Sequence, residues 1–187
     1  QFVPQFDLHL AYHTNAKIYA LQHGADEGSV AVIHNTINES RIATLPKAEA
    51  RTFLASLYPK IGGKKILLFV GAILKEKRIE VIIAALNRLN RTDLILLVVG
   101  DGPHLRIISE LCKSRTDVLL TGQIVEGVGP FFDASEMYLL PGTGGLGINE
   151  AMAHGLPILS GYADGSADDL VIDGENGFRL MTDSADE

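Results

Sequence analysis

Two stretches of the chain, KILLFVG at Lys65–Gly71 and LILLVVG at Leu94–Gly100, are apolar at nearly every position and end in glycine. Between them, Arg78–Asn90 carries isoleucine and leucine at helical spacing, with polar side chains in the intervening positions. Strands that are apolar on both faces, joined by an amphipathic helix, indicate a parallel sheet covered on both sides. The predicted fold class is therefore α/β, a Rossmann-like parallel sheet with helices on both faces.

The same alternation continues outward from this unit. Further short strands are predicted at Ser29–His34, Val118–Leu120, Met137–Leu140, Pro157–Ser160 and Phe178–Leu180. Helices are predicted at Ala16–His23, Pro46–Tyr58, Leu105–Lys113, Gly127–Ala134 and Ile148–His154. Phe53, Leu54 and Leu57 form the expected apolar side of the second of these helices. The regular alternation of strand and helix patterns begins after Gly62. Residues 1–62 are therefore expected to be the tail of a neighbouring domain with a linker helix, and residues 63–187 the sheet domain.

Composition excludes several classes of protein. The 187 residues are 47% hydrophobic and carry a net charge of −7, which argues against disorder and against a general nucleic-acid binder. No apolar run approaches the roughly 20 residues of a membrane-spanning helix. The single cysteine, Cys112, is expected to be a buried thiol, and the six histidines lack metal-ligand spacing. His154 is expected to cap helix carbonyls, and Asp164–Asp169 and Asp173–Gly177 to form solvated turns.

The loop Pro141–Gly147, between a predicted strand and a predicted helix, is the strongest candidate for a site. Its four glycines allow backbone N–H groups to approach a ligand, and the start of the following helix favours an anion. A phosphate or diphosphate is the expected ligand. The alternative is that the glycines bind nothing and only allow the strand and the helix to pack closely. Gly142, Gly144 and Gly147 also spell G-x-G-x-x-G, but the loop does not follow the first strand, so a dinucleotide such as NAD is the minor interpretation.

Charged residues flank this loop on both sides. Glu150 stands one turn into the following helix, where it could accept hydrogen bonds from sugar hydroxyls or simply balance the helix dipole. Lys75, Lys77 and Arg78 precede another predicted helix, at the end where cations are unfavourable. An anion held between these cations and the glycine loop explains their placement.

An ordered set of motifs resembles a known family. The motifs are Phe69-Val70-Gly71 with Lys77, Val98–Pro103, Leu120–Ile124, Pro141-Gly142, Glu150–Ile158 and Asp173–Phe178. Together they resemble the carboxyl-terminal domain of the group 1 (family 4) nucleotide-sugar glycosyltransferases, which have the GT-B fold. Residues 12–35 resemble the end of that family's amino-terminal domain. The resemblance covers nearly the whole chain. From it we expect that most of the amino-terminal acceptor domain and the closing carboxyl-terminal helices of the family lie outside these 187 residues.

The resemblance implies a donor site for a nucleotide diphospho-sugar. Gly71 and Lys77 would face the diphosphate, with Lys77 stabilising its charge as it departs. Ile124 would meet the base through its backbone, and Gly144, Gly145 and Leu146 would hold phosphate and sugar. Glu150 would match the second glutamate of the family's E-x7-E signature and bind the ribose hydroxyls.

Two departures from the family pattern affect this interpretation. Gly142 occupies the position of the first signature glutamate, and Ala72 replaces the arginine that follows the first glycine. The two departures favour a non-catalytic nucleotide-binding module as one alternative function. A nucleotide-sugar 2-epimerase, which shares the fold, is the other.

The resemblance implies a retaining glycosyltransferase that needs neither a metal nor another cofactor. Its acceptor is expected to be a glycan or a lipid-linked sugar, held through the missing domain, as in polysaccharide biosynthesis. A cytoplasmic location without a transmembrane segment is expected, with peripheral membrane association through the missing domain as a further expectation. The 187-residue chain alone is expected to bind nucleotide without transferring sugar.

Overall fold

The computed structural model describes residues 3–161 and 165–180. Its strands are β1 (His9–Ala11), β2 (Val30–Val32), β3 (Lys65–Val70), β4 (Leu94–Val99), β5 (Val118–Gly122), β6 (Met137–Leu140), β7 (Ile158–Ser160) and β8 (Gly177–Arg179). Its α-helices are α1 (Thr14–Gln22), α2 (Lys47–Leu57), α3 (Ile79–Leu89), α4 (Leu105–Cys112), α5 (Gly129–Asp133), α6 (Gly147–Ala153) and α7 (Ser166–Leu170). Short 3-10 turns lie at Val3–Gln5, Glu27–Ser29, Glu39–Arg41, Pro59–Ile61 and Lys75–Lys77.

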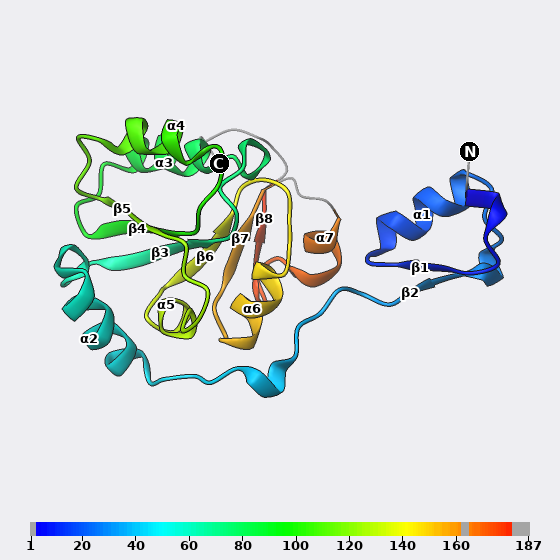
Figure 1. Ribbon diagram of the computed structural model, residues 1–187, viewed down its shortest axis with the longest axis horizontal. Coiled ribbons are helices and arrows are strands. Elements are labelled where there is room, and N and C mark those ends of the chain that lie inside the picture. The colour runs from blue at the N-terminus through cyan, green and yellow to red at the C-terminus, as the bar shows by residue number, and fades with distance from the viewer. Residues whose placement is uncertain (1–2, 162–164, 181–187) are drawn as a thin grey trace.

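The larger sheet is parallel throughout, with the strand order β5-β4-β3-β6-β7-β8. Helices α3 and α4 cover one side of it, and α2, α5 and α6 lie on the other (Figure 1). Every residue of β4 is buried, as expected for a strand covered on both faces. The Rossmann-like parallel sheet predicted from the sequence is therefore confirmed.

Buried side chains at helical spacing fix the flanking helices. In α3, Ile79, Ile82, Ile83 and Leu86 are buried against the sheet. In α4, Ile108 and Cys112 are buried, so the thiol is a core residue, as predicted.

Helix α2 buries a different face from the one expected. Ala50 and Leu54 are completely buried, whereas Phe53 and Leu57 are 46% and 54% exposed. Of the predicted apolar side, only Leu54 reaches the core. The reason is that α2 packs against α5, and the small Ala50 side chain allows the two helices to approach closely.

The amino-terminal residues form a small separate unit. Strands β1 and β2 pair in parallel, and α1 packs on them around Ala11, Ala20 and Val30. The side chains of Leu10 and Tyr12 on this unit remain 59% and 62% exposed. Such a two-stranded sheet is too small to bury all of its apolar residues.

Helix α7 joins this amino-terminal unit to the large sheet. The Asp169 carboxylate accepts a hydrogen bond from the Thr14 backbone N–H at 2.7 Å, and the Asn15 side chain donates to Asp168 at 2.8 Å. The prediction of a solvated turn is therefore wrong for residues 166–169, and Asp164 lies outside the described residues. An anion at the first turn of α1 complements the helix dipole, which explains why the carboxylates gather there.

Candidate functional site

The strand order reverses direction between β3 and β6, since the chain proceeds from β3 to β4 and β5 on one side and returns to β6 on the other. In open parallel sheets, ligands bind at such a switch point, beyond the carboxyl ends of the strands. Two loops leave the sheet here: residues 71–78 after β3 and residues 141–146 after β6. The structure therefore puts the predicted basic segment and the glycine loop at the same place.

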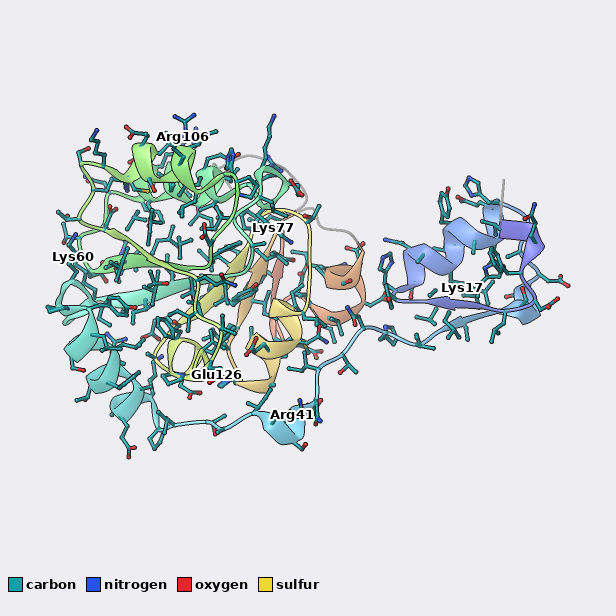
Figure 2. The ribbon with its side chains drawn as sticks, in the orientation of Figure 1. Lys17, Arg41, Lys60, Lys77, Arg106 and Glu126 are labelled. Carbon is teal, nitrogen blue, oxygen red and sulfur yellow. The ribbon has the colours of Figure 1, made fainter. Side chains whose placement is uncertain are left out.

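Lys77 joins these two loops directly. Its Nζ donates to the carbonyl oxygens of Thr143 at 2.7 Å and Gly144 at 2.6 Å. The Thr143 backbone N–H donates to the Glu76 carbonyl at 3.0 Å. Figure 2 shows Lys77 beside the loop that leads into α6. A single ammonium group thus fixes the glycine loop and keeps positive charge next to it.

Gly142 is required by this close approach. A Cβ atom at Gly142 would lie 2.0 Å from the Glu76 carbonyl oxygen and 2.8 Å from the Lys77 backbone. Any side chain would therefore force the two loops apart. In this conformation the position cannot accommodate a side chain, so the glutamate that the family resemblance leads one to expect here would not fit.

A row of glycines ends the three neighbouring strands β3, β4 and β5. The Gly71 N–H donates to the Val99 carbonyl at 3.0 Å, and the Gly100 N–H donates to the Gly122 carbonyl at 2.9 Å. A Cβ atom at Gly100, whose φ is +145°, would lie 1.9 Å from the Gly71 oxygen. Of these three glycines, the family resemblance gives a donor-site role to Gly71 alone, and includes Gly100 and Gly122 only as members of the family motifs. The available signal was the glycine that follows or closes each strand.

Glu150 lies in the first turn of α6, half-buried, with its backbone N–H donating to the Leu146 carbonyl at 3.0 Å. Burial raises the pKa of Glu150 above its ordinary value, and the nearby His154 partly offsets this effect. Glu150 is therefore a carboxylate held close to the glycine loop and only partly in contact with water.

The Tyr138 side chain packs against Gly147, the first residue of α6. Its hydroxyl donates to the Val70 carbonyl at 3.1 Å, which ties β6 to the end of β3. A Cβ atom at Gly147 would lie 2.2 Å from the Tyr138 hydroxyl oxygen, so α6 begins at a glycine for steric reasons. Burial, with a contribution from Glu150, raises the pKa of Tyr138 above its usual range, so the hydroxyl stays protonated. Sequence reasoning did not identify Tyr138, because its partner Val70 lies 68 residues earlier.

The remaining predicted site residues lie around this centre. Gly145 would place a Cβ atom 3.9 Å from the Lys77 Nζ, and Leu146 immediately precedes α6 with 43% of its surface exposed. Ile124 lies on the loop after β5, two strands away from β3, and is half-buried against the core. The structure therefore brings Lys77 and the glycine loop into contact and places Ile124 on a separate loop.

His154 does not cap helix carbonyls with its side chain, contrary to the prediction. Its Nδ1 lies 2.7 Å from the Asp133 Oδ1, and the two side chains are 2% and 4% exposed. A buried polar group needs a partner, and Asp133 supplies one that is distant in sequence.

Within residues 3–161 and 165–180, no three histidine, cysteine or acidic side chains are grouped so that they could hold a metal ion. None of the helices in this part of the chain is long and apolar enough to cross a membrane.

An apolar groove of about 420 Å³ lies between α3 and the sheet, and Pro141 at the start of the glycine loop lines one part of it. It is lined mainly by aliphatic side chains, including Leu67, Ile82, Leu86, Met137 and Leu139. A lining of this kind offers little to a diphosphate, so the groove is not the candidate donor site.

These features define a Rossmann-class domain with a glycine- and lysine-lined switch point. The chain belongs to the family described as "Glycosyl transferases group 1", whose profile matches residues 64–187. The predicted family resemblance is thereby confirmed.

Several characterised proteins are similar to the chain. A GDP-mannose-dependent alpha-mannosyltransferase of Corynebacterium glutamicum is 34% identical over 123 residues, which are 64% of this chain and 28% of that protein. An N-acetyl-alpha-D-glucosaminyl L-malate synthase of Bacillus anthracis is 27% identical over 183 residues, 84% of this chain and 48% of that protein. The chain thus spans less than half the length of these relatives.

Solved structures show the same fold. The crystal structure of Anabaena Alr3699/HepE in complex with UDP matches with a TM-score of 0.87 and 20% identity, over 99% of this chain and 53% of that one. A structure of the same protein with UDP-glucose matches with a TM-score of 0.84 and 20% identity, over 98% of this chain and 52% of that one.

Proposed function

We propose that this domain binds the nucleoside diphosphate part of a nucleotide-sugar donor between the Lys77 segment and the glycine loop. The observation that carries this proposal is the Lys77 ammonium fixed against the Thr143 and Gly144 carbonyls at the switch point. Backbone N–H groups and one cation at the carboxyl edge of a parallel sheet suit a diphosphate. The UDP and UDP-glucose complexes of HepE, and the GDP-mannose dependence of the C. glutamicum relative, support the same ligand class.

Each predicted residue has a role in this proposal. Gly71 and Lys77 face the diphosphate, and Lys77 stabilises the charge that develops as the bond from the anomeric carbon to the diphosphate breaks. Residues Gly144–Leu146 hold phosphate and sugar. Glu150 accepts hydrogen bonds from the ribose hydroxyls, and the Ile124 backbone meets the base. The proposal needs no metal, because Lys77 and the backbone N–H groups supply the positive charge.

The proposal for the whole protein is a retaining hexosyltransferase. Residues 1–62 would be the tail and linker of an amino-terminal domain that binds a glycan or lipid-linked acceptor, and residues 63–187 the donor domain. The acceptor hydroxyl would form the new glycosidic bond, and the nucleoside diphosphate would leave. A cytoplasmic location, with peripheral membrane association through the acceptor domain, fits a nucleotide-sugar donor and a lipid-linked acceptor.

To test this function, the full-length protein is incubated with GDP-mannose or UDP-glucose, with and without a panel of glycan and lipid-linked acceptors, and the released nucleoside diphosphate is measured. We expect release of nucleoside diphosphate only with an acceptor, and an α-linked product by NMR. The 187-residue chain should release none, because the acceptor must be positioned against the donor by the other domain. A change at C2 of the sugar without acceptor would indicate a 2-epimerase. Tight donor binding without release under any condition would indicate a non-catalytic module.

Glu150→Gln is expected to weaken UDP and GDP binding at least tenfold. A hydrogen bond to a charged group contributes about 1.5–3 kcal/mol, and the amide can replace only part of it. Isothermal titration of the 187-residue chain measures this effect. Glu175→Gln is the matched control, since Glu175 is exposed in the turn that precedes β8, at the amino ends of the parallel strands, whereas the site lies beyond their carboxyl ends. Unchanged affinity in Glu150→Gln would remove the ribose role and leave a site built from backbone groups.

The same variant should not lower the melting temperature at pH 7. Burial raises the pKa of Glu150, so the folded chain holds this proton more tightly than the unfolded chain does. The ionised carboxylate therefore costs stability above its raised pKa, and the cost disappears as pH falls below the unfolded value of about 4.3. Any advantage of the glutamine variant should shrink between pH 7 and pH 4.

A further inference from the structure

A connected set of buried side chains lies at the two ends of α6. The His154 Nδ1–H donates to Asp133 at 2.7 Å, and the His154 ring stacks on Phe132 with ring centroids 5.2 Å apart and planes 12° from parallel. Phe132 stacks in turn on Tyr138, with centroids 6.0 Å apart. Tyr138 lies beneath Gly147, the first residue of α6, whereas His154 follows the last. We refer to Asp133, Phe132, Tyr138 and His154 as the α6 support.

The Asp133 carboxylate is held at both oxygens. Oδ1 accepts the hydrogen bond from His154, and Oδ2 accepts one from the Leu45 backbone N–H at 2.8 Å. Leu45 belongs to the segment that leads into α2, so Asp133 is fixed between this segment and α6. With both oxygens occupied, the carboxylate cannot rotate freely, and it holds the imidazole ring in one orientation.

Glu150 lies one helical turn before His154, the histidine that pairs with Asp133. The His154 backbone N–H donates to the Glu150 carbonyl at 3.1 Å, and residues four apart in a helix share one side. His154 lowers the pKa of Glu150 against the effect of burial, and the Glu150 charge contributes to the raised pKa of Tyr138. Two members of the α6 support therefore interact electrostatically with the Glu150 carboxylate.

We propose that Asp133 and His154 are positioning residues for Glu150, which they hold in place for the ribose of the bound nucleotide by fixing the carboxyl-terminal end of α6. The proposal rests on the proposed function, in which Glu150 accepts hydrogen bonds from the ribose hydroxyls. A purely structural role would lower stability without acting through Glu150, so the two roles can be separated.

The test is a double-mutant cycle in the 187-residue chain, with UDP and GDP titrated separately by calorimetry. His154→Leu removes the donor to Asp133, and we expect about tenfold weaker binding of the nucleotide that the parent binds. His154→Asn places an amide N–H close to the position of Nδ1 and should restore affinity to within about twofold. In the Glu150→Gln background, His154→Leu should change affinity by less than about twofold, because the residue it positions has already lost its charge.

Asp133→Asn, made in both backgrounds, is the second variant and carries the test if His154→Leu does not fold. It should show the same dependence on Glu150. His23→Leu is the control: this histidine stacks on Tyr19 in the amino-terminal unit and should leave affinity unchanged.

The outcomes distinguish the two proposals. If the parent chain binds neither UDP nor GDP, the proposed function is wrong. If Glu150→Gln binds nucleotide as tightly as the parent, the ribose role of Glu150 is wrong. If Glu150→Gln weakens binding, two results would overturn the positioning role alone. One is unchanged affinity in both His154→Leu and Asp133→Asn. The other is an affinity loss that persists in full in the Glu150→Gln background.

Discussion

Replacing Lys77 with methionine is expected to weaken UDP and GDP binding about a hundredfold, a loss of about 2.7 kcal/mol. The ammonium holds the Thr143 and Gly144 carbonyls at 2.7 and 2.6 Å, so its removal releases the glycine loop. It also removes a positive charge from the proposed diphosphate site. Charge-assisted hydrogen bonds contribute about 1.5–3 kcal/mol each, so the loss of one such bond to the ligand already accounts for most of the effect. Isothermal titration of parent and variant chains measures it.

The comparison of nucleotide with nucleoside separates the two roles of Lys77. Lys77→Met should lose more affinity for UDP than for uridine, because only UDP carries the diphosphate. Lys60→Met is the control, since Lys60 is exposed in the turn after α2, before β3 begins. Equal losses for UDP and uridine would mean that Lys77 acts only by fixing the loop and does not face the phosphates.

Replacing Gly142 with alanine is expected to destabilise the chain by about 2–3 kcal/mol and to abolish measurable nucleotide binding. The added Cβ atom would lie 2.0 Å from the Glu76 carbonyl oxygen, and backbone atoms cannot move aside as a flexible side chain can. The loops must separate, which also breaks the contacts that Lys77 makes. Urea unfolding and calorimetry measure the two effects.

Gly28→Ala is the matched control for Gly142→Ala. A Cβ atom at Gly28 meets nothing within 4 Å, so this variant should change stability by no more than about 0.5 kcal/mol. A Gly142→Ala variant as stable as the parent, with intact nucleotide binding, would show that the two loops do not need their close approach.

The sheet domain follows closely from local sequence patterns. The predicted strand Met137–Leu140 has the same bounds as β6, and α3 begins and ends within one residue of the predicted helix. Long apolar runs and strong helical periodicity specify these elements regardless of their neighbours. The basic segment and the glycine loop were both identified, because glycine at a strand end and cations at a helix start are local signals.

Contacts between distant residues were not accessible in this way. Helix α7 is five residues long and polar, so no periodicity reveals it, and its aspartates bond to α1 more than 150 residues earlier. The sequence predicts that His154 caps nearby helix carbonyls, whereas its partner Asp133 lies 21 residues before it. The contact between Lys77 and Gly144 spans 67 residues. Sequence patterns locate the parts of the site, but the tertiary fold decides which parts meet.

We expect a nucleoside diphosphate to bind between the Lys77 segment and the glycine loop. A titration of the isotopically labelled 187-residue chain with UDP and with GDP, followed by backbone amide NMR, tests both binding and location. For at least one of them, we expect saturable shifts at Gly71, Lys77, Gly144, Gly145 and Glu150, with small changes in the amino-terminal unit. The absence of shifts with both nucleotides, or saturable shifts confined to the apolar groove around Leu86 and Met137, would contradict this expectation.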